Sequence, residues 1–224
     1  MTVTRHYRDA LRALLTPAER RTLERLNSPQ KIQSFLDGLP VNFCLTAWET
    51  MSPRRVLKAR IAHCAEGALL SAAAFAYHGQ PALIMDLRAT PHDDDHVVAL
   101  FRERELWGAI SKTNHSILRW RDPIYRTPRE LAMSYAHEYC MDSGEKSLVA
   151  FSRPFLLTRY APEVWVTSSD NLDWLMDALD DAPHEPVAPR PALRSRRRAS
   201  AIERSVLKLV EWPEPKRRAT ASRP

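Results

Sequence analysis

The sequence predicts an α+β fold in which helices pack on a small antiparallel sheet. Three short apolar segments, at residues 82–87, 96–101 and 106–110, follow one another with brief polar connections, a pattern typical of adjacent antiparallel strands. Before them, residues 65–76 are small and apolar on nearly every side, which indicates a buried central helix rather than a surface one. We therefore expect a central helix packed on the sheet, with extra helices on both sides.

Helix-start signals mark the N-terminal part of the chain. A hydroxyl residue that can cap a helix stands directly before a proline at Thr16, Ser28 and Ser52, and proline is favoured at the first helical position. We expect a helix after each signal. The first should reach about Leu26, and the second should end at Gly38, where glycine commonly terminates helices.

Three further elements are expected downstream of the sheet. Pro128 begins a helical pattern that continues to Tyr139, residues 148–157 read as a strand or extended segment, and Asp170 precedes a short helix over residues 171–179. These elements complete a globular domain over residues 1–181. At 224 residues and 44% hydrophobic content, the chain can bury one substantial core.

The chain changes character at residue 182. Of the 33 Lys and Arg residues, 11 lie in residues 182–224, against 4 of the 27 Asp and Glu residues, and the same segment holds 7 of the 17 prolines. We expect a basic, largely disordered tail with a possible short amphipathic helix at 201–212. This tail either contacts nucleic acid or another anionic surface weakly through its charge or is simply solvated. The remainder is close to neutral, which argues against a nucleic-acid-binding body.

The composition also indicates in which cellular compartment the protein is expected. No apolar run reaches the roughly 18–20 residues that a membrane-spanning helix needs, and the arginine-rich N-terminus lacks the apolar core of a signal peptide. The three cysteines (Cys44, Cys64 and Cys140) are odd in number and form no CxxC pair, which disfavours a disulfide framework or a zinc site. We expect free thiols in a cytoplasmic protein, with Cys44 and Cys140 inert and partly buried.

Cys64 stands where a loop turns into the central helix. A thiol at a helix N-terminus feels the positive end of the helix dipole and ionises more easily, as a nucleophile requires. A histidine on a neighbouring strand can then serve as its base, and His96 opens the second predicted strand. These two residues predict a cysteine–histidine acyl-transfer site.

The segment 60–110 resembles the core of the transglutaminase-like superfamily of papain-fold cysteine enzymes. The resemblance rests on Cys64 at the helix start, the Gly-Gln-Pro-Ala turn at residues 79–82 that feeds the first strand, and His96 leading the next strand before alternating apolar residues. Arg60 matches an arginine that is frequent before the family cysteine. The match covers less than a quarter of the chain, and it implies a papain-like fold with a Cys-His site.

The sequence departs from the family pattern at the third catalytic group. An aspartate that orients the histidine normally follows a Trp-containing strand. Trp107 is present here, but the expected position falls near Ser111. Asn114 is the nearest group that can substitute, because an amide holds an imidazole tautomer through a hydrogen bond without supplying charge. Asp122 is a second candidate.

The implied chemistry is acyl transfer or hydrolysis on a peptide or amide bond of a peptide or protein substrate. Cys64 would attack the carbonyl, and His96, oriented by Asn114, would take the proton and return it to the leaving amine. The Cys64 backbone N–H would donate to the oxyanion, with Asn42 or Trp48 as candidate second donors. Water or an amine would resolve the thioester, so peptidase, deamidase, amidase and transamidase remain open, and no cofactor is implied. The alternative is an inactive relative that binds a peptide or protein partner.

Three other features have competing interpretations. His63, beside the cysteine, is expected to be a surface residue. Residues 92–96 (His-Asp-Asp-Asp-His) include types that bind metals, but an acidic solvated loop is favoured, with His96 inward or paired with one of these aspartates. Residues 119–126 mix arginines with aromatics, as a nucleic-acid platform does, and a loop packed beside the cleft is favoured.

Overall fold

The computed structural model describes residues 3–45 and 49–215, and these form a mixed α+β fold. The helices are α1 (Arg5–Leu14), α2 (Pro17–Arg25), α3 (Pro29–Asp37), α4 (Pro53–Ala59), α5 (Cys64–Tyr77), α6 (Pro128–Met133), α7 (Pro162–Trp165), α8 (Asp173–Asp180), α9 (Arg190–Arg194) and α10 (Ala201–Ser205). The strands are β1 (Leu83–Arg88), β2 (His96–Glu103), β3 (Leu106–Ile110), β4 (Arg121–Tyr125), β5 (Ala150–Ser152), β6 (Phe155–Leu156) and β7 (His184–Pro186). Two 3-10 turns, η1 (Leu157–Arg159) and η2 (Val206–Lys208), complete the described elements.

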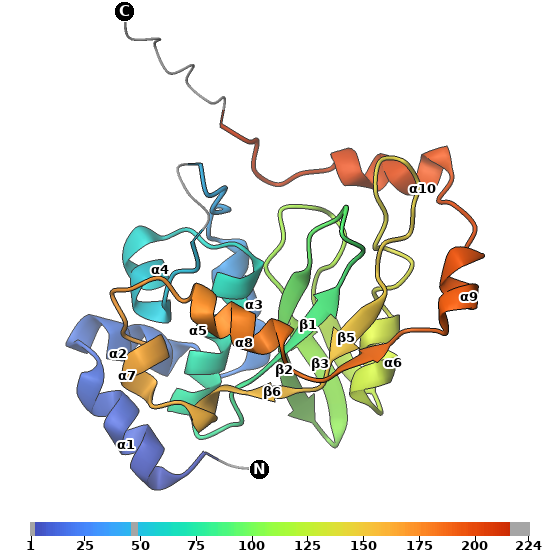
Figure 1. The fold of residues 1–224 in the computed structure, drawn as a ribbon. Helices are drawn as coiled ribbons and strands as arrows, with labels where there is room; N and C mark the ends of the chain where they lie inside the picture. The colour runs from blue at the N-terminus through green and yellow to red at the C-terminus, as the bar shows by residue number, and fades with distance from the viewer. Residues whose placement is uncertain (1–2, 46–48, 216–224) are drawn as a thin grey trace, which may run out of the picture.

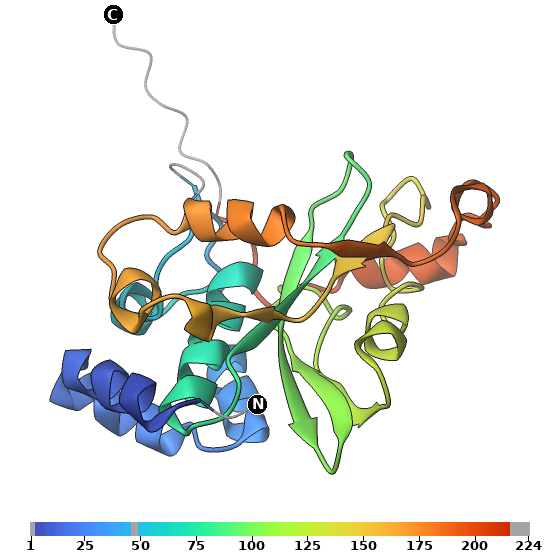
Figure 2. The same ribbon diagram turned by 60° about the horizontal axis from the view of Figure 1, so that its bottom comes forward.

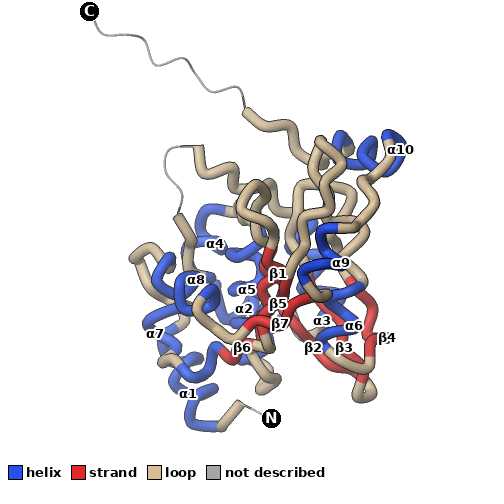
Figure 3. Tube along the Cα trace, turned by 45° about the vertical axis from the view of Figure 1, so that its right-hand side comes forward, coloured by secondary structure: helices blue, strands red, loops and turns tan. Residues whose placement is uncertain are grey.

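The strands form one open antiparallel sheet across the middle of the molecule (Figure 3). Its order in the described part of the chain is β4-β3-β2-β1-β5-β7, and β6 pairs with the opposite end of β1 from β5. The three predicted strands are confirmed as β1, β2 and β3, which pair in sequence order. The predicted extended segment at 148–157 contains β5 and β6.

Side chains alternate between two apolar layers on the faces of the sheet, as strand geometry requires. Ile84, Val97 and Ala99 belong to the core shared with α1–α5, α7 and α8, while Met85 and Val98 belong to a second core under α6. Figure 2 shows the sheet between these two groups of helices. Both faces are therefore covered, and α5 is buried in the larger layer, as its small apolar residues predict.

The predicted helix starts are confirmed. The hydroxyls of Thr16, Ser28 and Ser52 each accept a backbone N–H from the first turn of α2, α3 and α4, and Glu19 completes a capping box at Thr16. The C-cap of α3 is Gly38. No helix in the described ranges is long and apolar enough to cross a membrane.

Two helices differ from their predicted bounds. The pattern from Pro128 continues only to Met133 as helix, because residues 134–139 form turns. The helix expected after Asp170 starts later, since the Asn171 side chain accepts the backbone N–H groups of Thr50 and Asp173 and holds the chain before α8. Helix α1 and strand β4 were not predicted.

The C-terminal segment differs most from the prediction. Up to residue 215 it follows the body of the protein (Figure 1): β7 pairs with β5, and Val187 and Ala199 are buried. The Arg196 Nη1 atom donates to the Leu148 carbonyl at 2.7 Å. The segment is held by backbone pairing and arginine hydrogen bonds, which leave no hydrophobic periodicity in the sequence. The described part of the segment contains β7, α9, α10 and η2, and α10 and η2 lie within the predicted short helix at 201–212. Residues 216–224 of the predicted tail lie outside the described residues.

Candidate active site

Three elements end at one place and bring Cys64, His96 and Ser111 together. Helix α5 begins with Cys64, β2 begins with His96, and Ser111 directly follows β3, which pairs with β2. Close approach of α5 to the end of β3 needs a glycine. A Cβ atom on Gly67 would lie 2.6 Å from the Cβ atom of Lys112, which is inside van der Waals contact. Gly67 therefore allows the helix start to sit beside the strand ends.

A hydrogen-bond relay fixes the ring of His96. The Nε2 atom lies 2.8 Å from the Ser111 Oγ, and the Ser111 hydroxyl donates to the Leu118 carbonyl at 2.5 Å. A serine hydroxyl has one proton, and the Leu118 bond uses it, so Oγ accepts from Nε2–H. The neutral imidazole then has its lone pair on Nδ1, the nitrogen left for the thiol. Both ring and hydroxyl are buried.

Gln33 on α3 holds Ser111 in place. Its amide accepts the Ser111 backbone N–H at 3.0 Å and donates to the Ser111 carbonyl at 2.9 Å. A second donor bond from Gln33 goes to Asp37 at 2.8 Å, which fixes the amide orientation. The relay residue is therefore clamped on its backbone as well as on its side chain.

Two imidazoles act on the Cys64 thiol. Burial by itself raises the pKa of this thiol, but hydrogen bonds from His63 and His96, and the positive charge of each ring, hold the pKa of Cys64 well below its usual range. Burial by itself lowers the pKa of His63, but the hydrogen bond and charge interaction with Cys64, together with Glu66, outweigh burial and raise this pKa to about 9. The ionised thiol and the protonated His63 therefore stabilise each other.

His63 is not the surface residue that the sequence suggests. It is 8% exposed and is the N-cap of α5, and its Nε2 atom lies 3.2 Å from the Glu49 carbonyl and 3.5 Å from a Glu66 carboxylate oxygen. The sequence offered no periodic signal for this position, because it precedes the helix. The sequence feature that could have indicated burial is Glu66, three residues downstream. A glutamate at that spacing is typical of a capping box, which would make His63 the N-cap and place it beside the buried helix start.

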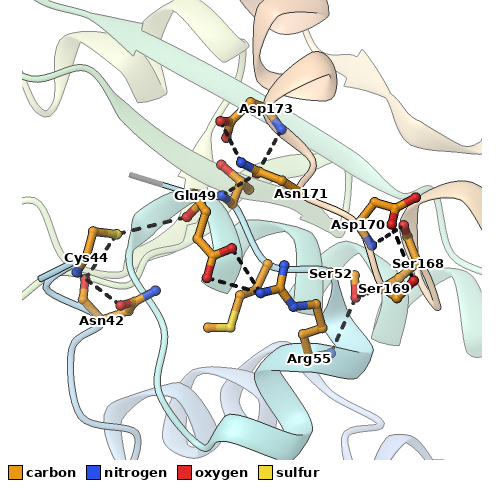
Figure 4. A network of polar contacts seen from close by, with 12 residues as sticks. Asn42, Cys44, Glu49, Ser52, Arg55, Ser168, Ser169, Asp170, Asn171 and Asp173 are labelled. Atoms are coloured by element: carbon orange, nitrogen blue, oxygen red, sulfur yellow. Dashed lines mark hydrogen bonds and ion pairs between the residues drawn. The ribbon is translucent and has the colours of Figure 1, made fainter. Parts of the chain in front are cut away.

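The fully buried Glu66 carboxylate organises the loops around the helix start. It accepts the backbone N–H groups of His63 at 2.8 Å and Met51 at 3.0 Å, and the Asn42 amide at 3.0 Å. Figure 4 shows the adjoining contacts, in which Cys44 bonds to Asn42 and Glu49. Burial raises the pKa of Glu66, and these donors offset part of that effect.

The remaining predicted site residues take other positions. The Asn114 side chain pairs with the backbone of Trp212, accepting its N–H and donating to its carbonyl, each at 2.9 Å. Ser111, and not Asn114, is the described partner of His96 Nε2. Asp122 accepts the indole N–H of Trp120. The Asn42 amide is committed to Glu66, and Trp48 lies outside the described residues.

Two further expectations concern Arg60 and the other cysteines. Arg60 ends α4 in the left-handed region, at φ 61°, and its guanidinium stacks on Phe35 rather than approaching the thiol. Burial raises the pKa of both Cys44 and Cys140, which disfavours their thiolates. Among the three free cysteines, Cys64 is thus the one with a lowered pKa.

A cleft of about 610 Å³ opens onto Cys64, His63 and His96. One part of its wall comes from the β1–β2 loop, including Asp94, and another from the segment after α10, including Trp212. This volume is within the range of ligand-binding pockets, and Cys64 as a residue is partly exposed. The site therefore combines a thiol of lowered pKa, a buried imidazole with a fixed partner and an open cleft.

One group of carboxylates has metal-like spacing among the described residues. Oxygens of Asp86, Asp95 and Asp180 lie within 4.8 Å of one another. However, His184 is 3.0 Å from Asp86, and Arg88 is 3.9 Å from both Asp86 and Asp180. These nitrogens already supply positive charge and donors, so we assign the group to structural ion pairing.

No protein-family model matches the sequence, and no curated protein matches it either. The function is therefore inferred from the geometry of the site.

Proposed function

We propose that the protein is a cysteine-dependent acyl-transfer enzyme with a transglutaminase-like, papain-type core, acting on peptide or amide bonds. The observation that carries the proposal is the Cys64 thiol at the start of a buried helix, with two imidazoles that lower its pKa. Perturbation of this kind is typical of nucleophiles. The fixed tautomer of His96 adds the base that the chemistry needs.

The proposed reaction begins with the Cys64 thiolate attacking the substrate carbonyl. The backbone N–H of Cys64, at the first position of α5, has no acceptor within the helix and donates to the developing oxyanion. His96 Nδ1, which has taken the proton of the Cys64 thiol, passes this proton to the leaving amine as the C–N bond breaks, which leaves a thioester on Cys64 and a neutral His96 ring. The neutral ring then takes a proton from water or an amine through Nδ1, and attack of that nucleophile releases the acyl product.

Ser111 performs the orienting role in this proposal, in place of the predicted Asn114. Its hydroxyl oxygen accepts a hydrogen bond from Nε2–H, its own O–H donates to the Leu118 carbonyl, and it supplies no charge. The protonated His63 supplies the charge that stabilises the thiolate. Hydrolysis and transfer to an amine both use this arrangement.

Alkylation of Cys64 with iodoacetamide as a function of pH tests the proposal, with each cysteine peptide followed by mass spectrometry. We expect the Cys64 rate to exceed the rates of Cys44 and Cys140 near neutrality and to level off at a lower pH than theirs, because the pKa of Cys64 lies well below that of an ordinary thiol. Cys44 and Cys140 should react only as the pH rises past that of an ordinary thiol. A Cys64 profile that rises with pH like that of a free thiol would reject the enzyme and favour an inactive binding module.

A further inference from the structure

The cleft has two chemically different walls, and one is built by the end of the described chain. We define the strap as residues 206–214, which follow α10 and cross the end of the sheet where the loops gather (Figure 1). Leu207, Val210, Trp212 and Glu214 of the strap line the same cleft as Cys64.

The strap is fixed mainly through its backbone. Its Glu211 N–H donates to the Asn114 carbonyl at 2.9 Å, and the Leu209 carbonyl accepts the Ser116 N–H at 3.1 Å. The Asn114 side chain adds two bonds to Trp212. Outside the cleft, Glu211 pairs with Arg119 at 2.9 Å. Because backbone groups hold the strap, the side chains of Leu207, Val210 and Trp212 are left to form an apolar surface beside the nucleophile.

The rest of the rim is acidic. Five carboxylates line the cleft, and Lys112 is the lone Lys or Arg among its described lining residues. The Lys112 ammonium is buried and donates to the Leu39 carbonyl. The carboxylates are Asp93, Asp94, Asp95, Glu138 and Glu214.

Two of these carboxylates are available to a ligand. Glu138 pairs with Arg121 at 2.7 Å, Asp95 accepts the Ala89 N–H at 2.7 Å, and Asp93 accepts the Ser147 hydroxyl. Asp94 and Glu214 are exposed, and their carboxylates have no hydrogen-bond or ion-pair partner within the described ranges. Like charges that converge on a cleft with low-dielectric walls focus the field and concentrate ligands of opposite charge.

We propose that the substrate is a peptide that pairs an apolar side chain with a basic one. The apolar side chain packs on Leu207, Val210 and Trp212 of the strap, and the basic side chain lies at Asp94 and Glu214. The proposal rests on the acyl-transfer function of the same site. Trp212 and the two free carboxylates are thus the specificity-determining residues.

Chloroacetyl dipeptide amides with the sequences Leu-Lys, Leu-Glu and Gly-Lys test this directly on the full chain. The Cys64 thiolate displaces chloride, so that a C–S bond forms as the C–Cl bond breaks, and mass spectrometry of the Cys64 peptide gives the rate. We expect Leu-Lys to react at least about tenfold faster than Leu-Glu near 10 mM salt, where the Debye length is about 30 Å. The preference should largely disappear at about 1 M salt.

Matched variants separate the two walls. Asp94→Asn with Glu214→Gln should remove most of the Lys-over-Glu preference. Glu163→Gln with Asp177→Asn makes the same charge change at exposed residues outside the cleft and should retain it. Trp212→Ala should reduce the Leu-over-Gly preference while leaving the charge preference in place.

Failure of the inference and failure of the proposed function give different results. Fast alkylation of Cys64 by all three probes, with no discrimination between them, would overturn the inferred specificity and leave the reactive thiol standing. Slow alkylation by every probe, at the rate of an ordinary thiol, would overturn the acyl-transfer function on which the inference rests. A preference retained by the Asp94 and Glu214 double variant would place its cause elsewhere and refute the assignment.

Discussion

Ser111→Ala is the sharpest perturbation of the proposed relay. The substitution removes the oxygen that accepts Nε2–H of His96, a bond of 2.8 Å between buried groups. Either the buried N–H loses its partner, or the proton moves to Nδ1 and the base loses its acceptor site. An unpaired buried donor costs about 1–3 kcal/mol, which corresponds to about a 5- to 150-fold loss of rate.

The two phases of p-nitrophenyl acetate hydrolysis report on this loss separately. The burst measures attack by a thiolate that is already ionised, whereas steady-state turnover requires His96 to accept a proton from water through Nδ1. We expect the steady-state rate of Ser111→Ala to fall about 5- to 150-fold, with a much smaller change in the burst. The ¹⁵N chemical shifts of the His96 ring should show the tautomer released from its Nε2–H form.

Ser71→Ala is the matched control. Ser71 is equally buried and its hydroxyl donates to the Gly67 carbonyl at 2.8 Å within α5, so the variant loses a buried serine hydroxyl without touching His96. Its turnover should stay close to that of the unmodified protein, with both variants folded by circular dichroism. If Ser111→Ala kept its steady-state rate and its Nε2–H tautomer, the relay would have no catalytic role.

Two other predictions address the charge and the packing of the site. His63→Gln removes the cation that lowers the pKa of Cys64. For each unit that this pKa rises, Cys64 alkylation at a pH below it should fall by up to about tenfold, and the difference from the unmodified protein should shrink as the pH rises. Equal rates at pH 6 would refute the role of His63. Gly67→Ala places a Cβ atom 2.6 Å from that of Lys112 and should lower the free energy of unfolding in urea by about 1–3 kcal/mol. Gly38→Ala is the control, because a Cβ atom there would make an ordinary contact at 3.5 Å with the Phe35 carbonyl and the backbone φ is −78°. It should be nearly neutral, and similar losses in the two variants would contradict the packing argument.

Local signals in the sequence were sufficient for most of the central fold. Capping residues before prolines placed α2, α3 and α4, and short apolar segments with brief polar connections placed β1, β2 and β3. These elements are specified by interactions within a few residues of the chain, which is why periodicity and capping reveal them. Strand β4 and the C-terminal segment are different, because distant backbone pairing and arginine-to-carbonyl bonds hold them, and neither leaves a periodic pattern.

The candidate site likewise has residues that the sequence could predict and one that it could not. Cys64 and His96 stand at the beginnings of strongly patterned elements, so the sequence could place both residues. The partner of His96 could not be chosen by residue type, since Asn114 is the better orienting group on chemical grounds and Ser111 is the weaker one. The choice depends on two long-range facts, the clamp of Gln33 on Ser111 and the pairing of Asn114 with Trp212. Each joins positions at least 78 residues apart.

No carboxylate is among the described partners of His96, but the proposed catalysis does not require one, because another residue supplies the charge that stabilises the thiolate. In an aspartate-oriented site, one acid both fixes the tautomer and stabilises the imidazolium. Here the two tasks are separate: Ser111 fixes the tautomer without charge, and the protonated His63, held between the Glu49 carbonyl and Glu66, stabilises the thiolate directly. Because nucleophilic attack needs the thiolate rather than a strongly basic histidine, a neutral relay is sufficient once a second imidazole maintains the ionised cysteine.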